Sequence, residues 1–242
     1  MSIEGHHITV GGLDVEVVRK PIKNLHLGVY PPDGRIRVAA PVGVSDEAVR
    51  LAVVTRMGWI KRQQSKFDSQ PRQSERSYVS GESHFFFGQR YRLNVIDGAS
   101  AGRVCIRNSR TLDLYVRTGS ETAMRERVFL DWYRRELRSR AAPLVAAWAE
   151  AFGIDPPQWG IKRMKTKWGS CNIEARRVWL NLELVKKPPQ CLEYVIVHEL
   201  AHFFERNHSD RFVALLDQKL PLWRLTRDEL NAAPLAHEEW NE

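Results

Sequence analysis

One stretch of the sequence combines residue types that can bind a metal ion and activate water. Residues 198–202 read His-Glu-Leu-Ala-His. Residues four apart share one face of a helix, so the imidazoles of His198 and His202 can reach a single ion. Glu199 is rotated by about 100° from His198, so its carboxylate can take a proton from a water held there. Zinc lowers the pKa of such a water to about 7, and the motif predicts a hydrolytic site with one Zn²⁺ ion per chain.

A zinc site of this kind needs a third protein ligand and one open position for water. The leading candidate is His208, which follows His202 by six residues. Asparagine tolerates a left-handed conformation, so we expect Asn207 to end the helix and to return His208 to the ion.

Two other ligand arrangements have to be weighed against this one. The 198/202/208 spacing equals that of the metzincins, which have glycine at the position of Glu205 and a methionine turn downstream. All four methionines of this chain precede the motif, which argues against a metzincin. A downstream carboxylate, Asp228 or Glu229, stays open as an alternative third ligand.

The elements that hold these residues follow from the periodicity of the sequence. Alternating apolar residues predict a strand over 178–185 with one buried face, whose edge we expect to accept an extended peptide. The motif helix is expected to begin near Gln190, after Pro188-Pro189. Upstream, a helical pattern runs from Glu121 to Gly153, and we expect Pro143 to kink or split it.

The N-terminal half reads as two groups of short strands. The predicted strands are 8–10, 15–18, 25–29 and 35–38, then 85–87, 91–96, 104–107 and 112–116. Between the groups, Ser45 is expected to cap a helix that reaches about Gln64, and the later part of 61–76 is polar enough for a loop. The pattern predicts an α+β chain with a β-rich N-terminal domain at 1–120 and a metallohydrolase domain at 121–242.

Further motifs make the chain similar to a known family. They are Met164-Lys165-Thr166-Lys167-Trp168-Gly169-Ser170-Cys171, Leu180-Asn181-Leu182, Tyr194 to His202, and Asn207-His208-Ser209. These segments resemble the YgjP-like metallopeptidases, a bacterial zincin family related to the SprT-like domains. The resemblance implies a zincin-like catalytic domain, zinc held by His198, His202 and His208, and Glu199 as general base. Lys167 stands where arginine is more often expected, which keeps the charge but loses the bidentate geometry.

Basic residues are distributed unevenly around this motif. The 242 residues include 37 Lys and Arg and 29 Asp and Glu, a net charge of +8. Residues 125–187 hold 14 basic and 7 acidic side chains, whereas 188–242 hold 5 and 10. We predict that Lys165, Lys167 and Trp168 contact the substrate, which suits an anionic one. A solvated strand edge is the alternative reading of the two lysines.

Composition and motif together favour a zinc-dependent metallopeptidase acting on a peptide or protein. No apolar run approaches the roughly 18 residues of a membrane span, no secretory leader is evident, and three scattered cysteines form no disulfide framework. We therefore expect a cytoplasmic protein without a membrane partner.

Two other functions stay open at this point. Families of this kind have also been described as UTP-pyrophosphatase-like, so the same water would attack a nucleoside triphosphate whose phosphates the lysines clamp. The basic surface also favours nucleic acid association, with the site acting on a DNA-bound protein.

Overall fold

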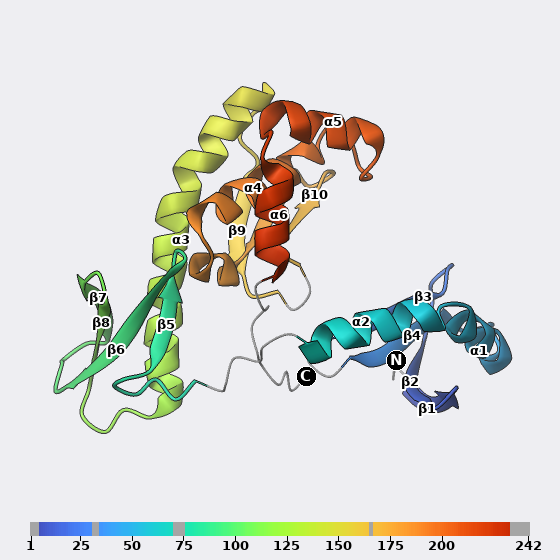
Figure 1. Cartoon of the computed structure of the whole chain (residues 1–242), viewed down its shortest axis with the longest axis horizontal. Coiled ribbons are helices and arrows are strands. Elements are labelled where there is room, and N and C mark those ends of the chain that lie inside the picture. Colours follow the sequence, from blue (N-terminus) through green and yellow to red (C-terminus); the bar gives the residue numbers. More distant parts are fainter. Residues whose placement is uncertain (1–4, 31–33, 70–75, 165–166, 233–242) are drawn as a thin grey trace. The chain divides into compact units, whose positions relative to one another are not determined.

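The computed structural model describes residues 5–30, 34–69, 76–164 and 167–232, and these divide into two compact units on either side of residues 74 and 75 (Figure 1). Each unit has its own hydrophobic core. The division does not lie near residue 120, where the sequence analysis placed it. The four strands that follow residue 76 share a core with the second unit, so they belong to it rather than to the first.

The first unit is a four-stranded sheet with two helices. Its elements are β1 (Gly5–Val10), β2 (Leu13–Lys20), β3 (His26–Tyr30), β4 (Arg35–Pro41), α1 (Asp46–Thr55) and α2 (Met57–Ser69), with strand order β1-β2-β4-β3. Val49, Val53 and Ile60 bury the helices against the sheet. The single helix predicted to about Gln64 is broken at Arg56, and α2 continues into the segment expected to be a loop.

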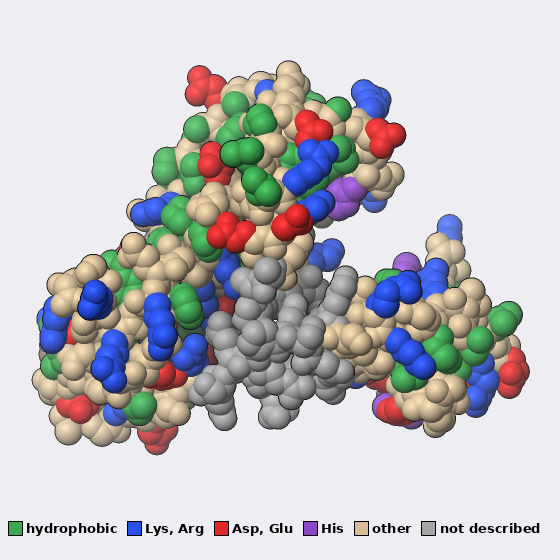
Figure 2. All heavy atoms as spheres, viewed as in Figure 1, with side chains coloured by type: hydrophobic (Ala, Val, Ile, Leu, Met, Phe, Trp, Pro, Cys, Tyr) green, Lys and Arg blue, Asp and Glu red, His purple; other side chains and the backbone are tan. Residues whose placement is uncertain are grey.

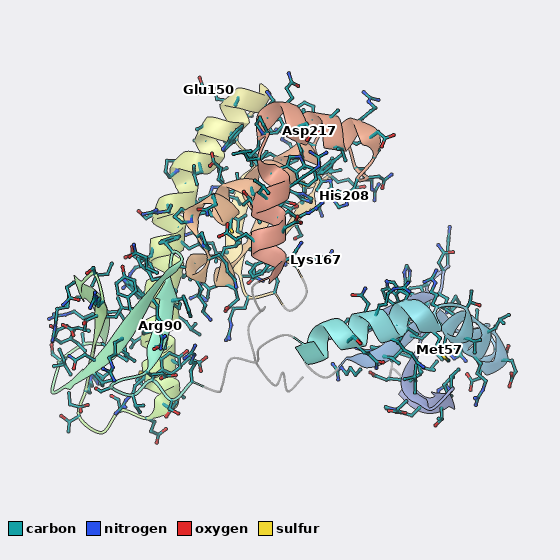
Figure 3. The ribbon with its side chains drawn as sticks, in the orientation of Figure 1. Met57, Arg90, Glu150, Lys167, His208 and Asp217 are labelled. Carbon is teal, nitrogen blue, oxygen red and sulfur yellow. The ribbon has the colours of Figure 1, made fainter. Side chains whose placement is uncertain are left out.

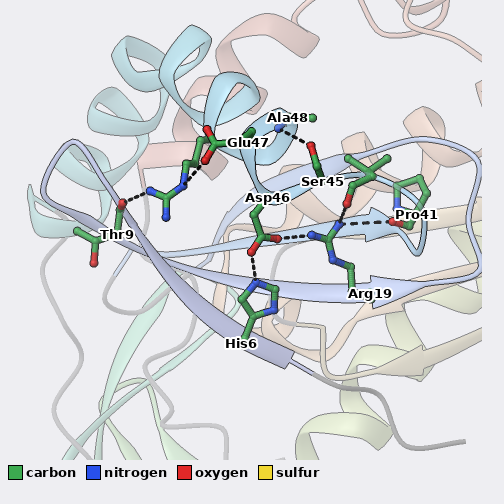
Figure 4. A network of polar contacts seen from close by, with 10 residues as sticks. His6, Thr9, Arg19, Pro41, Ser45, Asp46, Glu47 and Ala48 are labelled. Atoms are coloured by element: carbon green, nitrogen blue, oxygen red, sulfur yellow. Dashed lines mark hydrogen bonds and ion pairs between the residues drawn. The ribbon is translucent and has the colours of Figure 1, made fainter.

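Ser45 caps α1 as predicted. Its hydroxyl accepts a hydrogen bond from the N–H of Ala48 at 3.3 Å (Figure 4). In the first turn, the carboxylate of Asp46 meets the imidazole of His6 at 2.9 Å and the guanidinium of Arg19. The hydrogen bond with His6, together with the Arg19 contact, lowers the pKa of Asp46. These contacts tie the start of α1 to β1 and β2.

The second unit begins with another four-stranded sheet. Its strands are β5 (Ser83–Phe86), β6 (Gln89–Asp97), β7 (Arg103–Asn108) and β8 (Thr111–Val116), in the order β5-β6-β8-β7. One face of this sheet is buried against the long helix α3 (Thr122–Phe152), where the rings of Phe86 and Trp132 lie 4.7 Å apart.

α3 is one helix of 31 residues, and Pro143 does not split it. The proline is exposed and lies between two buried stretches. The first stretch (Phe129, Trp132, Tyr133) packs with the β5–β8 sheet, and α3 then continues alongside α4 (Pro189–Ala201), as Figure 1 shows. Packing on both sides keeps the backbone helical across the missing hydrogen bond. Neither α3 nor any other helix in the described ranges is long and apolar enough to cross a membrane.

A three-stranded sheet and three helices complete the second unit. They are β9 (Gln158–Lys162), β10 (Gly169–Asn172), β11 (Arg177–Asn181), α4, α5 (Asp210–Lys219) and α6 (Trp223–Ala232), with strand order β10-β11-β9. These elements and the sheets before them make the chain α+β, as predicted.

The strand predicted over 178–185 is shorter than expected, and it lies in the middle of its sheet rather than at an edge. It ends at Asn181, whose side chain accepts a hydrogen bond from the N–H of Glu183 and caps a 3₁₀ helix over Leu182–Lys186. Because β11 pairs with β9 on one side and β10 on the other, it has no free edge for a peptide. The edge beside the motif helix belongs to β10.

Candidate metal centre

Helix α4 carries the histidine motif through the core of the second unit. Pro189 lies in its first turn, where a proline loses no helical hydrogen bond. Most of the helix is buried, including Cys191, Leu192, Val195, Ile196, Val197, Leu200 and Ala201. A helix that is apolar on nearly all sides belongs in a core. This packing fixes the positions from which His198 and Glu199 project.

The chain reverses after α4 by a route that differs from the prediction. The helix ends at Ala201, with His202 as its C-cap, rather than at Asn207. Asn207 does not take the left-handed conformation expected of it. The turn is held instead by the N–H of Glu205, which donates to the carbonyl of Ala201 at 3.1 Å. Ser209 then caps α5, and His208 returns to the motif between the two helices.

The structure brings the three predicted histidines together. Their ligand nitrogens all lie within 4.8 Å of one another, and the Nε2 atoms of His198 and His208 are 3.1 Å apart. In the described ranges this is the only group of three or more potential metal ligands. Below it lies Phe212 of α5, a buried residue whose ring centroid is 4.8–5.0 Å from all three imidazoles.

The alternative carboxylate ligands lie outside this cluster. Asp228 forms an ion pair with Arg227 at 2.9 Å, and Glu229 accepts a hydrogen bond from Gln190 at 3.0 Å. Both carboxylates are therefore engaged elsewhere, and the histidine set is the arrangement that the structure supports.

The hydrogen bonding of His202 and the lowered pKa of His198 favour binding of a cation by the cluster. The Nδ1 of His202 lies 3.1 Å from the carbonyl of Glu205. A carbonyl only accepts, so Nδ1 carries the proton and the Nε2 lone pair faces the cluster. Burial, and then the charges of the other two histidines, lower the pKa of His198 to about 3. The Nε2 atoms of His198 and His208 face each other across 3.1 Å, so a proton or an ion has to lie between them. The donor set therefore fits a metal ion that prefers nitrogen ligands.

Glu199 lies against β10 in a position that depends on a glycine. Its side chain is buried, with an exposed fraction of 5%. A Cβ atom built on Gly169 would lie 2.4 Å from Oε1 and 2.8 Å from Cδ of Glu199. Burial raises the pKa of Glu199 to about 8, and the charge of Lys167 partly opposes this. Sequence reasoning missed the role of Gly169; its only signal was the Trp-Gly-Ser-Cys motif itself.

A second residue missed by sequence reasoning holds the segment that leads into β10. Asn181 is fully buried, and its side-chain nitrogen donates to the carbonyls of Met164 at 2.8 Å and Lys167 at 2.7 Å. Its main-chain N–H donates to the carbonyl of Trp168 at 2.9 Å. These contacts set the path of the chain on which Lys167 and Trp168 stand. The only sequence signal for Asn181 was the Leu-Asn-Leu motif of the resemblance.

The histidines and Glu199 line a cleft of about 950 Å³. Two of the three residues predicted to contact substrate, Lys167 and Trp168, also line it. The third, Lys165, lies outside the described residues. Figure 3 labels Lys167 and His208 in this part of the second unit. The lining of the cleft also includes Arg206 and, from α6, Arg227.

The chain is similar to a known family and to solved structures. The family model of the YgjP-like metallopeptidase domain matches residues 23–233. No curated protein matches the chain. Among solved structures, the chain is similar to the metallopeptidase zymogen abylysin of Pyrococcus abyssi, with 18% identity over 37% of this chain and 90% of that chain and a TM-score of 0.35. It is also similar to the metallopeptidase zymogen jannalysin of Methanocaldococcus jannaschii, with 24% identity over 37% and 95% and a TM-score of 0.33.

The family match covers most of the chain, including both the sheet of β5–β8 and the histidine cluster. It confirms the resemblance noted from the Trp-Gly-Ser-Cys and His-Glu-Leu-Ala-His motifs, and membership in a metallopeptidase family implies a bound metal. The chain belongs to the YgjP-like metallopeptidase family.

Proposed function

We propose that the chain is a zinc-dependent peptidase whose metal ligands are His198, His202 and His208 and whose general base is Glu199. The observation that carries this proposal is the position of the Glu199 carboxylate. It lines the same cleft as the three imidazoles, on the adjacent position of the same helix. Three histidine nitrogen donors with a fourth position for water are typical of catalytic zinc sites.

When bound, a zinc ion supplies a Lewis acid that lowers the pKa of its water to about 7. Glu199 accepts the proton of the attacking water as the oxygen bonds to the carbonyl carbon of the peptide. The same carboxyl group then donates this proton to the leaving nitrogen as the C–N bond breaks. The side chain of Glu199 is buried, with an exposed fraction of 5%, so the surrounding protein holds its carboxyl group in place for both proton transfers.

We infer that the substrate peptide lies extended along β10. This strand lines the cleft from Gly169 to Asn172, and among the described strands it pairs with β11 alone, so its other edge can form main-chain hydrogen bonds with a peptide. A peptide N-methylated beside the scissile bond is expected to bind more weakly, with a raised KM. An unchanged KM at every methylated position would argue against strand addition.

A second candidate function is hydrolysis of a nucleoside triphosphate at the same centre. The observation that favours it is the pair of cleft cations Lys167 and Arg206, neither of which forms an ion pair with a carboxylate in the part of the chain that the structure describes. Unpaired cations beside the metal would clamp phosphate oxygens. Acidic peptides offer the same cations a partner, so the peptidase assignment stays the first choice.

The test compares zinc-loaded wild type with Glu199→Gln on three substrates: casein-derived peptides, UTP and a DNA-bound protein. Wild type is expected to cleave peptides, and Glu199→Gln to lose about 10²- to 10⁴-fold in rate, the range for general acid–base catalysis. Glu150→Gln is the matched control, since Glu150 is an exposed carboxylate of α3 away from the cleft (Figure 3).

Zinc content is measured for all three proteins and is expected to be equal. Equal activity of wild type and Glu199→Gln on every substrate would contradict the catalytic role. Hydrolysis of UTP without peptide cleavage, lost in the same variant, would instead establish the second candidate.

A further inference from the structure

The sheet of β5–β8 has two faces of opposite character. Residues paired across neighbouring strands lie on the same face. The face turned to α3 carries buried side chains such as Phe86, Leu93 and Leu114. The register places the other set together: Phe85 beside Arg90, and Arg103 beside Tyr115. Arg92 lies on the same face between them, paired with Ser83 and Thr111.

The second face, called here the arginine face, is defined by Phe85, Arg90, Arg92, Arg103 and Tyr115. All three arginines are exposed, and none forms an ion pair with any residue described by the structure. Figure 2 shows Lys and Arg side chains gathered over these strands, and Figure 3 labels Arg90 among them. The face therefore carries positive charge that none of the described carboxylates neutralises.

The acidic residue closest in register does not offset this charge. Asp113 of β8 lies on the same face but is buried, and it accepts hydrogen bonds from Asn94 at 2.9 Å and Arg107 at 2.8 Å. Its carboxylate is thus committed to Arg107. None of the three arginines of the arginine face pairs with a described carboxylate, and Arg90 donates only to the hydroxyl of Ser83, at 3.0 Å.

Aromatic rings stand among these arginines. The ring of Phe85 is accessible to solvent, with an exposed fraction of 38%. Tyr115 is half-buried, with the guanidinium of Arg103 4.2 Å from its ring centroid. Along β6, the positions beside the two rings, Arg90 and Ile96, are six residues apart, or about 20 Å. On an open sheet with this spacing, the flat rings can stack on bases while the guanidinium groups bind phosphates of the same strand.

We propose that the arginine face binds single-stranded nucleic acid. Unpaired arginines bind backbone phosphates, and Phe85 and Tyr115 stack on bases without sequence preference. An acidic peptide would use the arginines but would leave the exposed ring of Phe85 without a planar partner. A duplex would keep its bases stacked within the helix and out of reach of both rings. The inference is independent of the metal centre, so zinc-loaded and zinc-free protein are expected to bind alike.

The first test measures binding of a fluorescent 12-nucleotide mixed-sequence DNA strand by anisotropy between 50 and 200 mM salt. Three phosphate contacts predict that affinity falls about 18-fold over this range, and about threefold for Arg90→Gln/Arg92→Gln, which keeps one contact. Arg135→Gln/Arg211→Gln removes the same charge from exposed helix positions and is expected to behave as wild type. Circular dichroism and zinc content check that the variants are folded.

The second test separates stacking from charge. Phe85→Leu keeps the apolar side chain and the main-chain carbonyl that accepts a 2.5 Å hydrogen bond from Tyr133, so the fold is preserved. This variant is expected to bind the DNA strand at least about fivefold more weakly, yet to bind an abasic strand as wild type does. Absence of binding, binding unaffected by either variant, or equal competition by duplex DNA or polyglutamate would each overturn the proposal.

Discussion

The substitution Gly169→Ala tests how the fold positions Glu199, the proposed general base. The added Cβ would lie 2.4 Å from Oε1 of Glu199, while ordinary contacts begin at 3.4 Å, so the carboxylate has to retreat by the difference, 1.0 Å. A displacement of about 1 Å in a reacting group lowers catalysis by about 10²-fold, or about 2.7 kcal/mol in the activation barrier. The three atoms nearest to the added Cβ all belong to Glu199 and none to the proposed histidine ligands, so zinc content is expected to be unchanged.

The assay is kcat/KM on a fluorescence-quenched peptide, measured with zinc content and the free energy of unfolding. Gly43→Ala is the matched control, because a Cβ there meets nothing within 4 Å and the backbone is not in the left-handed region. It is expected to retain full activity. Overpacking at Gly169 is expected to lower the free energy of unfolding by about 1–3 kcal/mol, which leaves the protein folded under assay conditions.

A double-mutant cycle decides whether the glycine acts through Glu199. If it does, Gly169→Ala is expected to lower kcat/KM in wild type but to have no further effect in the Glu199→Gln background. Wild-type activity in Gly169→Ala, or the same loss in both backgrounds, would refute the reasoning.

Three further predictions concern the third metal ligand, the segment that leads into β10, and the dependence of stability on pH. His208→Ala is expected to lose zinc, measured by mass spectrometry, whereas Asp228→Asn keeps it; the reverse would make the carboxylate the third ligand. Asn181→Leu leaves two main-chain carbonyls without their donor, so urea unfolding is expected to show a loss of at least about 1–3 kcal/mol; an unchanged midpoint would exclude the proposed role. Burial lowers the pKa of His84 from 6.5 to about 4. Between these values the unfolded chain binds more protons, so stability falls as pH falls from 6.5 to 4, by at most about 1.4 kcal/mol per unit. His84→Leu is expected to flatten this slope in urea titrations, and an equally steep slope would assign the effect to other groups.

The parts of the fold that depend on neighbouring residues could be predicted from the sequence. Helical spacing places His198 and His202 on one face regardless of the rest of the chain, and a serine before an amphipathic segment caps a helix wherever it occurs. The strand groups could be predicted for the same reason, because alternating apolar and polar residues within a short segment indicate a strand with one buried face.

The parts that depend on distant residues could not be predicted. Leu182, Leu184 and Val185 continue an apolar run after β11, yet all are buried in a 3₁₀ helix that the side chain of Asn181 caps. A glycine selected for the space it leaves to a carboxylate of another element has no local signature. The boundary between the units was misplaced because a change of periodicity marks where strands give way to a helix, not where one core ends.

The length of α3 also determines where the chain can be cut. The helix buries Phe129, Trp132 and Tyr133 against one sheet and Val145 and Ala149 further along. A fragment starting at residue 121 would keep the histidine cluster but expose three large aromatic side chains to water, at about 1.5–3 kcal/mol each. One starting at residue 76 retains the complete core. Because α3 packs against both the β5–β8 sheet and the elements that hold the histidine cluster, we expect these two parts to unfold in one cooperative transition. Limited proteolysis is expected to leave them together in a single fragment.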